Sequence, residues 1–115
     1  MQRPAEITLR DIELNDILKD LIQTKMADLE KTHDKLISCH VVLEKLSRRH
    51  HKGNPYAVSI DLKTRERHEI IIKEESRAGD QSLTSLIRDA FKKARVHLNE
   101  LKKRQRQKQS ILYGA

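Results

Sequence analysis

The sequence predicts an α+β domain with the element order β-α-β-β-β-α, in which two helices cover one face of a four-stranded sheet. The spacing of apolar residues shifts from about 3.6 to 2 near Ile37 and returns to about 3.6 near Ser82, so strands separate two helices. Short connectors join the three strands after Ile37, which favours an antiparallel meander.

A short strand and its exit account for residues 7–14, and the first helix follows them. Asn15 or Asp16 is placed to cap this helix by accepting hydrogen bonds from its free N–H groups. Apolar residues then recur at steps of three and four and predict a helix that runs to about Leu36. These apolar residues are Leu18, Leu21, Ile22, Met26 and Leu29.

Three strands are predicted over residues 37–44, 56–62 and 68–74. Apolar and polar residues alternate in the first two strands, as they do in a sheet with one buried face. The third strand contains three consecutive isoleucines at 70–72, which is typical of a buried strand. The Gly-Asn-Pro sequence at 53–55 supplies turn chemistry between the first two strands.

Ser82 is the predicted N-cap of the last helix. Apolar residues at helical spacing from Leu83 to Leu101 form one face of this helix, and we expect it to fray after Arg104. Residues 1–109 are assigned to a single domain, and residues 110–115 to a short C-terminal tail.

The net charge of +7 arises entirely in the C-terminal part of the chain. Residues 1–80 hold 15 basic and 15 acidic side chains, whereas residues 81–115 hold 9 basic and 2 acidic ones. On the last helix, five cations and one amide lie within roughly 40° of one line beside the apolar face. Because exposed helix faces usually mix both signs, a line of cations without an acid favours polyanion binding. The line consists of Arg88, Lys92, Arg95, Asn99, Lys102 and Arg106.

A second basic cluster lies between the first two strands of the meander, at Arg48, Arg49, His50, His51 and Lys52. Three interpretations are open: a finger that contacts phosphate, an inert charged hairpin tip, or a metal site. Adjacent histidines with no Cys or carboxylate nearby are a weak signal for a metal.

Composition and motifs argue against several classes of protein. No apolar run approaches the roughly 20 residues needed to span a bilayer, and the N-terminus lacks the apolar core of a signal peptide. The lone Cys39 excludes an internal disulfide, fits a reducing cytosol, and is expected to be a small buried hydrophobe. No phosphate loop, nucleophile motif or zinc motif occurs, so the sequence indicates no catalysis, cofactor or small-molecule substrate. Scarce aromatic residues favour structured RNA or DNA over single strands.

The other histidines are isolated along the sequence. His33, His40 and His68 carry no predicted role. His97 lies at the border of the apolar face of the last helix, where we expect it to pack or to snorkel.

Several segments occur in an order that matches a known family. They are Asn15–Asp20, Lys25–Lys31, Asp34, Cys39–Glu44, His51–Tyr56, Val58, Ile60–Leu62 and Ile87–Phe91. Together they resemble the ribosome hibernation-promoting factors, a family also called protein Y, ribosome-associated inhibitors or sigma-factor modulation proteins. The resemblance covers about residues 5–105. The sequence departs from the family at Thr84, where an aromatic residue is common, and at residues 96–98, where Arg-Gln-Leu is common.

The resemblance implies a fold similar to that of double-stranded-RNA-binding domains, and a cytoplasmic factor that is not an enzyme. It also implies binding to the small ribosomal subunit and its ribosomal RNA in the decoding channel, where the factor blocks messenger and transfer RNA. The chain resembles the short form of the family, without a second, dimerising domain, and we expect a monomer away from the ribosome.

The predicted RNA-binding residues come from the family and from the charge pattern. The resemblance implies contacts from basic positions on both helices, which here are Lys19, Lys25, Lys31, Lys93 and Lys102. The charge pattern adds Arg48, Arg49, Lys52, Arg88, Lys92, Arg95, Lys103 and Arg106.

The residues leave two other functions open. A general module for structured RNA or DNA would bind naked duplex as tightly as ribosomes. A protein-interaction adaptor that regulates a transcription factor would bind an acidic protein partner with weak salt dependence.

Overall fold

The computed structural model describes residues 5–46, 55–76 and 81–113, with side chains described as far as Arg104. Over these residues the chain forms helices and strands in the predicted order, which confirms the α+β class. They are β1 (Glu6–Arg10), α1 (Asp16–Thr32), β2 (Leu36–Lys45), β3 (Tyr56–Thr64), β4 (Glu69–Glu75) and α2 (Leu83–Tyr113).

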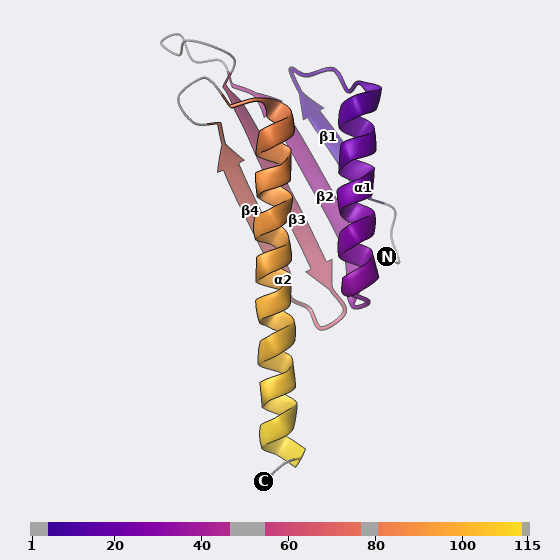
Figure 1. The fold of residues 1–115 in the computed structure, drawn as a ribbon, viewed down its shortest axis with the longest axis vertical. Coiled ribbons are helices and arrows are strands. Elements are labelled where there is room, and N and C mark those ends of the chain that lie inside the picture. Colours follow the sequence, from indigo (N-terminus) through magenta and orange to yellow (C-terminus); the bar gives the residue numbers. More distant parts are fainter. Residues whose placement is uncertain (1–4, 47–54, 77–80, 114–115) are drawn as a thin grey trace.

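The strands form one mixed sheet in the order β1-β2-β3-β4. The pairs β2–β3 and β3–β4 are antiparallel, as predicted for a meander. The pair β1–β2 is parallel, and α1 provides the long connection that parallel neighbours need. Both helices lie on the same face of the sheet, as predicted, with α1 near β1 and β2 and α2 over β3 and β4 (Figure 1).

The core lies between this sheet and the two helices. Alternate residues of β2 and β3, such as Val41 and Ile60, are buried against Ile22 of α1 and Ile87 of α2. Ile60 is 0% exposed and Leu98 is 3% exposed, so the predicted buried faces of strand and helix are confirmed. Complete burial of one such side chain stabilises the fold by about 1.5 to 3 kcal/mol.

Both helices begin with the predicted caps. The Asn15 Oδ1 accepts a hydrogen bond from the backbone N–H of Leu18 at 2.8 Å. The Ser82 Oγ accepts one from the backbone N–H of Ser85 at 3.1 Å. These bonds satisfy donors that a first helical turn otherwise leaves without a partner.

Both predicted helix ends are wrong. The first helix ends at Thr32 rather than near Leu36, because the backbone of His33 leaves the helical conformation, with φ −134° and ψ 81°. The second helix continues past Arg104 to Tyr113 and projects beyond the sheet (Figure 1). Residues 105–109 alternate Gln with Arg and Lys, which are all good helix formers, so nothing in that stretch favours an earlier end.

No helix in the described ranges has both the length and the apolarity of a membrane span.

Candidate nucleic-acid interface

A groove between α1 and α2 gathers basic side chains from both helices. Lys25 comes from α1, and three cations come from consecutive turns of α2. Buried Leu29 and Phe91 lie at its base. Four cations and two carboxylates line the groove, so its formal charge is 4 − 2 = +2. These side chains are Lys25, Arg88, Lys92, Arg95, Asp28 and Asp89.

The positions of the cations on α2 follow from helical spacing. Arg88, Lys92 and Arg95 are four and three residues apart, so they share one face of the helix. Phe91 is buried, so the α2 face that packs on the core adjoins this basic face. Packing on the sheet therefore turns the basic face towards α1, where Lys25 completes it.

Contacts made by His33 and by Lys102 join the C-terminal end of α1 to α2. The buried imidazole of His33 has its Nε2 atom 2.9 Å from the Asn99 Oδ1, and its Nδ1 atom 3.2 Å from the Leu29 carbonyl oxygen. The Lys102 ammonium donates a hydrogen bond to the Thr32 carbonyl at 3.3 Å. The sequence carries no signal for the His33–Asn99 contact, because the two residues are 66 positions apart. This contact helps to hold the two walls of the groove together.

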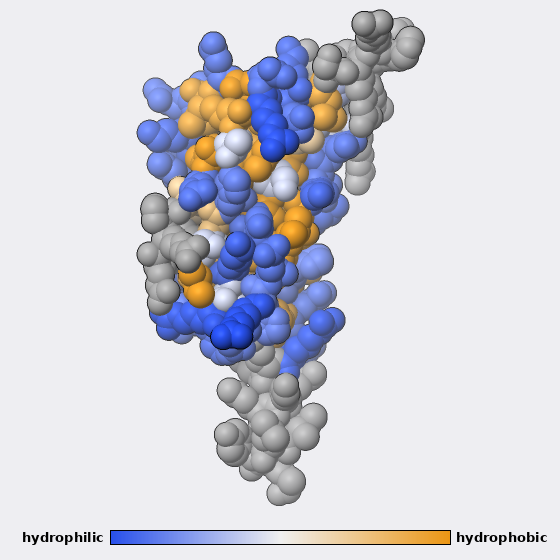
Figure 2. Space-filling view, turned by 180° about the vertical axis from the view of Figure 1, so that it is seen from behind, coloured by the Kyte–Doolittle hydropathy of each residue, from blue (hydrophilic) through white to orange (hydrophobic). Residues whose placement is uncertain are grey.

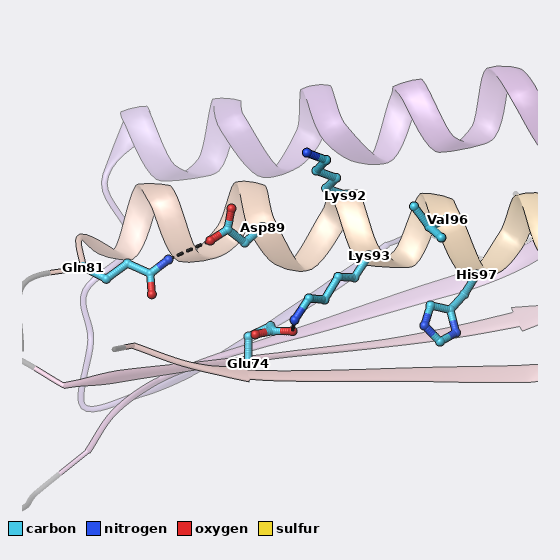
Figure 3. Close-up of a pocket in the computed structure, with 7 residues that line it drawn as sticks. All are labelled: Glu74, Gln81, Asp89, Lys92, Lys93, Val96 and His97. Atoms are coloured by element: carbon cyan, nitrogen blue, oxygen red, sulfur yellow. Dashed lines mark hydrogen bonds and ion pairs between the residues drawn. The ribbon is translucent and has the colours of Figure 1, made fainter. Parts of the chain in front are cut away.

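The opposite side of α2 faces β4 and has balanced charge. Lys93 forms an ion pair with Glu74 of β4, and it points towards the sheet, whereas its neighbour Lys92 points towards α1 (Figure 3). A pocket on this side is lined by Glu74 and Lys93, together with Asp89 and Lys92, which also line the groove, so its carboxylates and ammonium groups are equal in number. Two consecutive lysines of the predicted site therefore lie in different surroundings.

The three predicted lysines of α1 do not share one face. Lys19, Lys25 and Lys31 are spaced by six residues, and at 100° per residue they are about 120° apart around the helix. Lys25 is partly buried and lines the groove, whereas Lys19 and Lys31 are exposed. The structure therefore brings only Lys25 of this set to the basic face of α2.

The remaining predicted positions are near the end of α2 or outside the described residues. Lys103 is exposed, as is Lys102, apart from the bond of Lys102 to α1. The side chain of Arg106, and the residues Arg48, Arg49 and Lys52, lie outside the part of the chain that the structure describes.

Cys39 lies in the core, as predicted. It is 2% exposed, and burial together with the Asp61 carboxylate raises the pKa of its thiol to about 12. Because a thiolate is the reactive form of cysteine, this thiol is inert at neutral pH.

The described residues contain no cluster of three or more metal-ligating side chains. His97 is exposed beside Lys93 and does not pack into the core, so that expectation was wrong in part.

A family model described as "Sigma 54 modulation protein / S30EA ribosomal protein" matches residues 5–106. The chain belongs to this family. Its members are ribosome-associated factors that act by binding rather than by catalysis, so the chain is not an enzyme. Association with ribosomes implies the cytoplasm for the family.

Two of the solved structures that this chain resembles are a ribosomal subunit interface protein and a domain of Protein Y. A ribosomal subunit interface protein from Coxiella burnetii aligns with a TM-score of 0.69 and 14% identity over 86% of this chain and 97% of that one. The N-terminal domain of Protein Y from Thermus thermophilus aligns with a TM-score of 0.66 and 20% identity over 88% of this chain and 99% of that one. Both likenesses establish the fold. A comparison with curated protein sequences finds no match.

Proposed function

We propose that this protein binds the small ribosomal subunit in the decoding channel and blocks messenger and transfer RNA there. The net positive groove between α1 and α2 carries the proposal, because it is present in a chain whose family is ribosome-associated. Cations along such a groove bind RNA phosphates and release their counterions, which makes the affinity strongly dependent on salt.

Inhibition in this proposal comes from occupancy. The domain is a packed body whose long helix α2 projects beyond the sheet (Figure 1). A domain of this kind, held by phosphate contacts, excludes other RNA from the volume that it fills. Shape and phosphate contacts suffice for this, because a structured RNA surface is recognised without stacking on exposed aromatic side chains.

The three lysines of α1 supply a way to distinguish a channel from a duplex. An isolated RNA duplex that docks on the groove contacts the domain on one side only. It reaches Lys25 but leaves Lys19 and Lys31, each about 120° away around the helix, facing solvent. A channel encloses the domain and brings RNA to several sides at once. A contribution of both Lys19 and Lys31 to ribosome binding would therefore favour the channel over a duplex.

Co-sedimentation with whole ribosomes, separated subunits and duplex RNA over a salt series tests the proposal. We expect binding to the small subunit, and expect Lys19→Gln, Lys25→Gln and Lys31→Gln each to flatten its salt slope by roughly one unit. Gln23→Ala, which removes no charge at an exposed position of α1, is the control and leaves the slope unchanged. Equal affinity for naked duplex, with an effect of Lys25→Gln alone, would indicate a general structured-RNA module.

Competition with transfer RNA tests the position on the subunit. Filling the subunit with transfer RNA beforehand is expected to prevent binding, and added protein is expected to suppress cell-free translation in proportion to the ribosomes occupied. Undiminished binding to filled subunits contradicts the decoding-channel site. Inhibition far below the ribosome concentration, with cut ribosomal RNA, contradicts a mechanism of occupancy.

A further inference from the structure

The strand β4 forms one edge of the sheet and carries an exposed apolar side chain. Ile71 lies on the sheet face that the helices leave open, and it is 52% exposed. Ile71 is one of three exposed large hydrophobic residues in the described chain; Ile17 and Val96 lie on the helices, and Val96 is on the side of α2 away from the sheet (Figure 3).

The open face of the sheet, seen from the side opposite the helices in Figure 2, mixes hydrophobic and hydrophilic side chains. An edge strand that carries an exposed apolar side chain is a template for pairing with another strand.

The hydrogen bonds to β3 determine which backbone groups of β4 face outwards. The Thr64 N–H donates to the His68 carbonyl, and the Ser76 N–H donates to the Tyr56 carbonyl. Residues in an antiparallel pair alternate between bonded and non-bonded positions, so the even-numbered residues of β4 direct their N–H and C=O groups at β3. The odd-numbered residues Glu69, Ile71 and Lys73 therefore direct theirs away from the sheet, towards a strand that would be added there.

The charges on these odd-numbered residues are complementary to those on a second, antiparallel copy of the same strand. If two copies of β4 pair antiparallel about a twofold axis at Ile71, the two Ile71 side chains meet, and Glu69 of each copy lies opposite Lys73 of the other. Cross-strand pairs of opposite charge stabilise a sheet, whereas like charges directly opposite destabilise it.

The two neighbouring registers that also match outward-facing backbone groups lack this complementarity. One places Glu69 opposite Ile71, and the other places Glu69 opposite Glu75. Charges on an edge strand commonly prevent pairing. Here their alternating signs favour one self-pairing register over its neighbours.

We propose that β4 is a dimerisation edge, through which a second copy of this chain extends the sheet antiparallel about a twofold axis at Ile71. The interface is isologous, so both copies contribute the same residues. The groove between α1 and α2 lies on the side of α2 away from β4, and the dimer leaves it open. The inference therefore goes beyond the proposed function and does not depend on it.

Sedimentation velocity on the full chain, from about 1 µM to about 1 mM, tests the proposal, because a small edge interface is expected to be weak. The wild-type chain should change from monomer to dimer within this range. The expectation of a monomer away from the ribosome then applies only at low concentration. A chain that stays monomeric at every concentration overturns the proposal.

Charge reversal tests the register. Glu69→Lys and Lys73→Glu each create two like-charge pairs in the dimer and should weaken association about tenfold or more, and the double exchange should restore it to within about threefold. Glu6→Lys on the opposite edge strand, β1, is the matched control and should leave association unchanged. Thermal melting of each variant verifies that it is folded, since Glu69 also faces Lys63 of β3. Equal dimerisation of the single and double variants overturns the register.

Two further measurements test the axis at Ile71. Ile71→Lys should abolish the dimer, since two like charges meet at the axis, whereas Ile71→Val should retain it. Amide hydrogen exchange at Ile71 should slow as the protein concentration rises, with no change in β1. Slowing confined to β1, or an Ile71→Lys variant that dimerises as the wild-type chain does, overturns the proposal.

Discussion

The two sides of α2 differ in charge although both carry lysine. On the side towards α1, cations outnumber carboxylates in the groove that Lys92 lines. On the side towards β4, Lys93 is paired with Glu74 and the charges balance. Lys92 and Lys93 are adjacent in the sequence but lie about 100° apart around the helix, so different elements pack beside them. The comparison teaches that the strand packed beside a helix decides which of its cations remain available to a polyanion.

Removing the groove cations should have the largest effect. The triple variant Arg88→Gln, Lys92→Gln and Arg95→Gln should lower affinity for ribosomes on the order of 100-fold at about 0.1 M salt, because each lost phosphate contact removes released counterions. The salt slope should flatten by roughly three units, and the free energy of unfolding should change by less than about 0.5 kcal/mol per exposed substitution. Ribosome co-sedimentation and urea denaturation measure the two quantities. An unchanged salt slope would mean that the groove is only a solvated surface.

Breaking the contact between His33 and Asn99, which joins the two helices, should have the second largest effect, and this effect is on stability. His33→Ala removes a buried imidazole and its contact with Asn99, and should lower the free energy of unfolding by about 1 to 3 kcal/mol, because the site loses a hydrogen bond and is left with a cavity. Urea denaturation measures the change, and His97→Ala, at an exposed position of α2, is the matched control.

A double-mutant cycle isolates the pair itself. His33→Ala and Asn99→Ala should couple by at least about 0.5 kcal/mol if the two side chains interact directly. Additive effects of the two substitutions would contradict the contact.

Substituting each of the two adjacent lysines separately should have a smaller effect and tests the comparison directly. Lys93→Gln should lower the free energy of unfolding by about 0.5 to 1 kcal/mol, since it leaves the Glu74 carboxylate without its ion pair. The same variant should change ribosome affinity by less than about twofold. Lys92→Gln should do the reverse, with a larger loss of affinity and no measurable loss of stability. If the two variants behave alike, the difference between the two sides of α2 is without consequence.

Removing a carboxylate from the groove should have the smallest effect. Asp28→Asn raises the formal charge of the groove from +2 to +3, and should raise affinity for ribosomes about twofold at low salt, with the gain disappearing at high salt. Asp20→Asn, elsewhere on the exposed surface of α1, is the matched control. An equal gain from both variants would show that total charge, rather than the groove, determines binding.

Sequence patterns predicted the elements more accurately than the helix ends. The alternation around Ile60 and the three- and four-residue steps through Leu98 are local, and both residues are buried as predicted. The end of α1 was wrong because it depends on His33, whose burial requires α2. Within the candidate site, the cationic face of α2 was predicted from spacing, but its partner Lys25 was not distinguished from Lys19 and Lys31.

The sequence alone determined the order of the helices and strands and which of their faces are apolar, because those properties depend on neighbours two to four positions away. Only the tertiary structure decided that Lys93 pairs with Glu74, that His33 meets Asn99, and that Lys25 joins the cations of α2. Each of these contacts joins separate elements, so it depends on how helices and strands pack together. Packing is a collective property of the whole core, and no local pattern of residues specifies it.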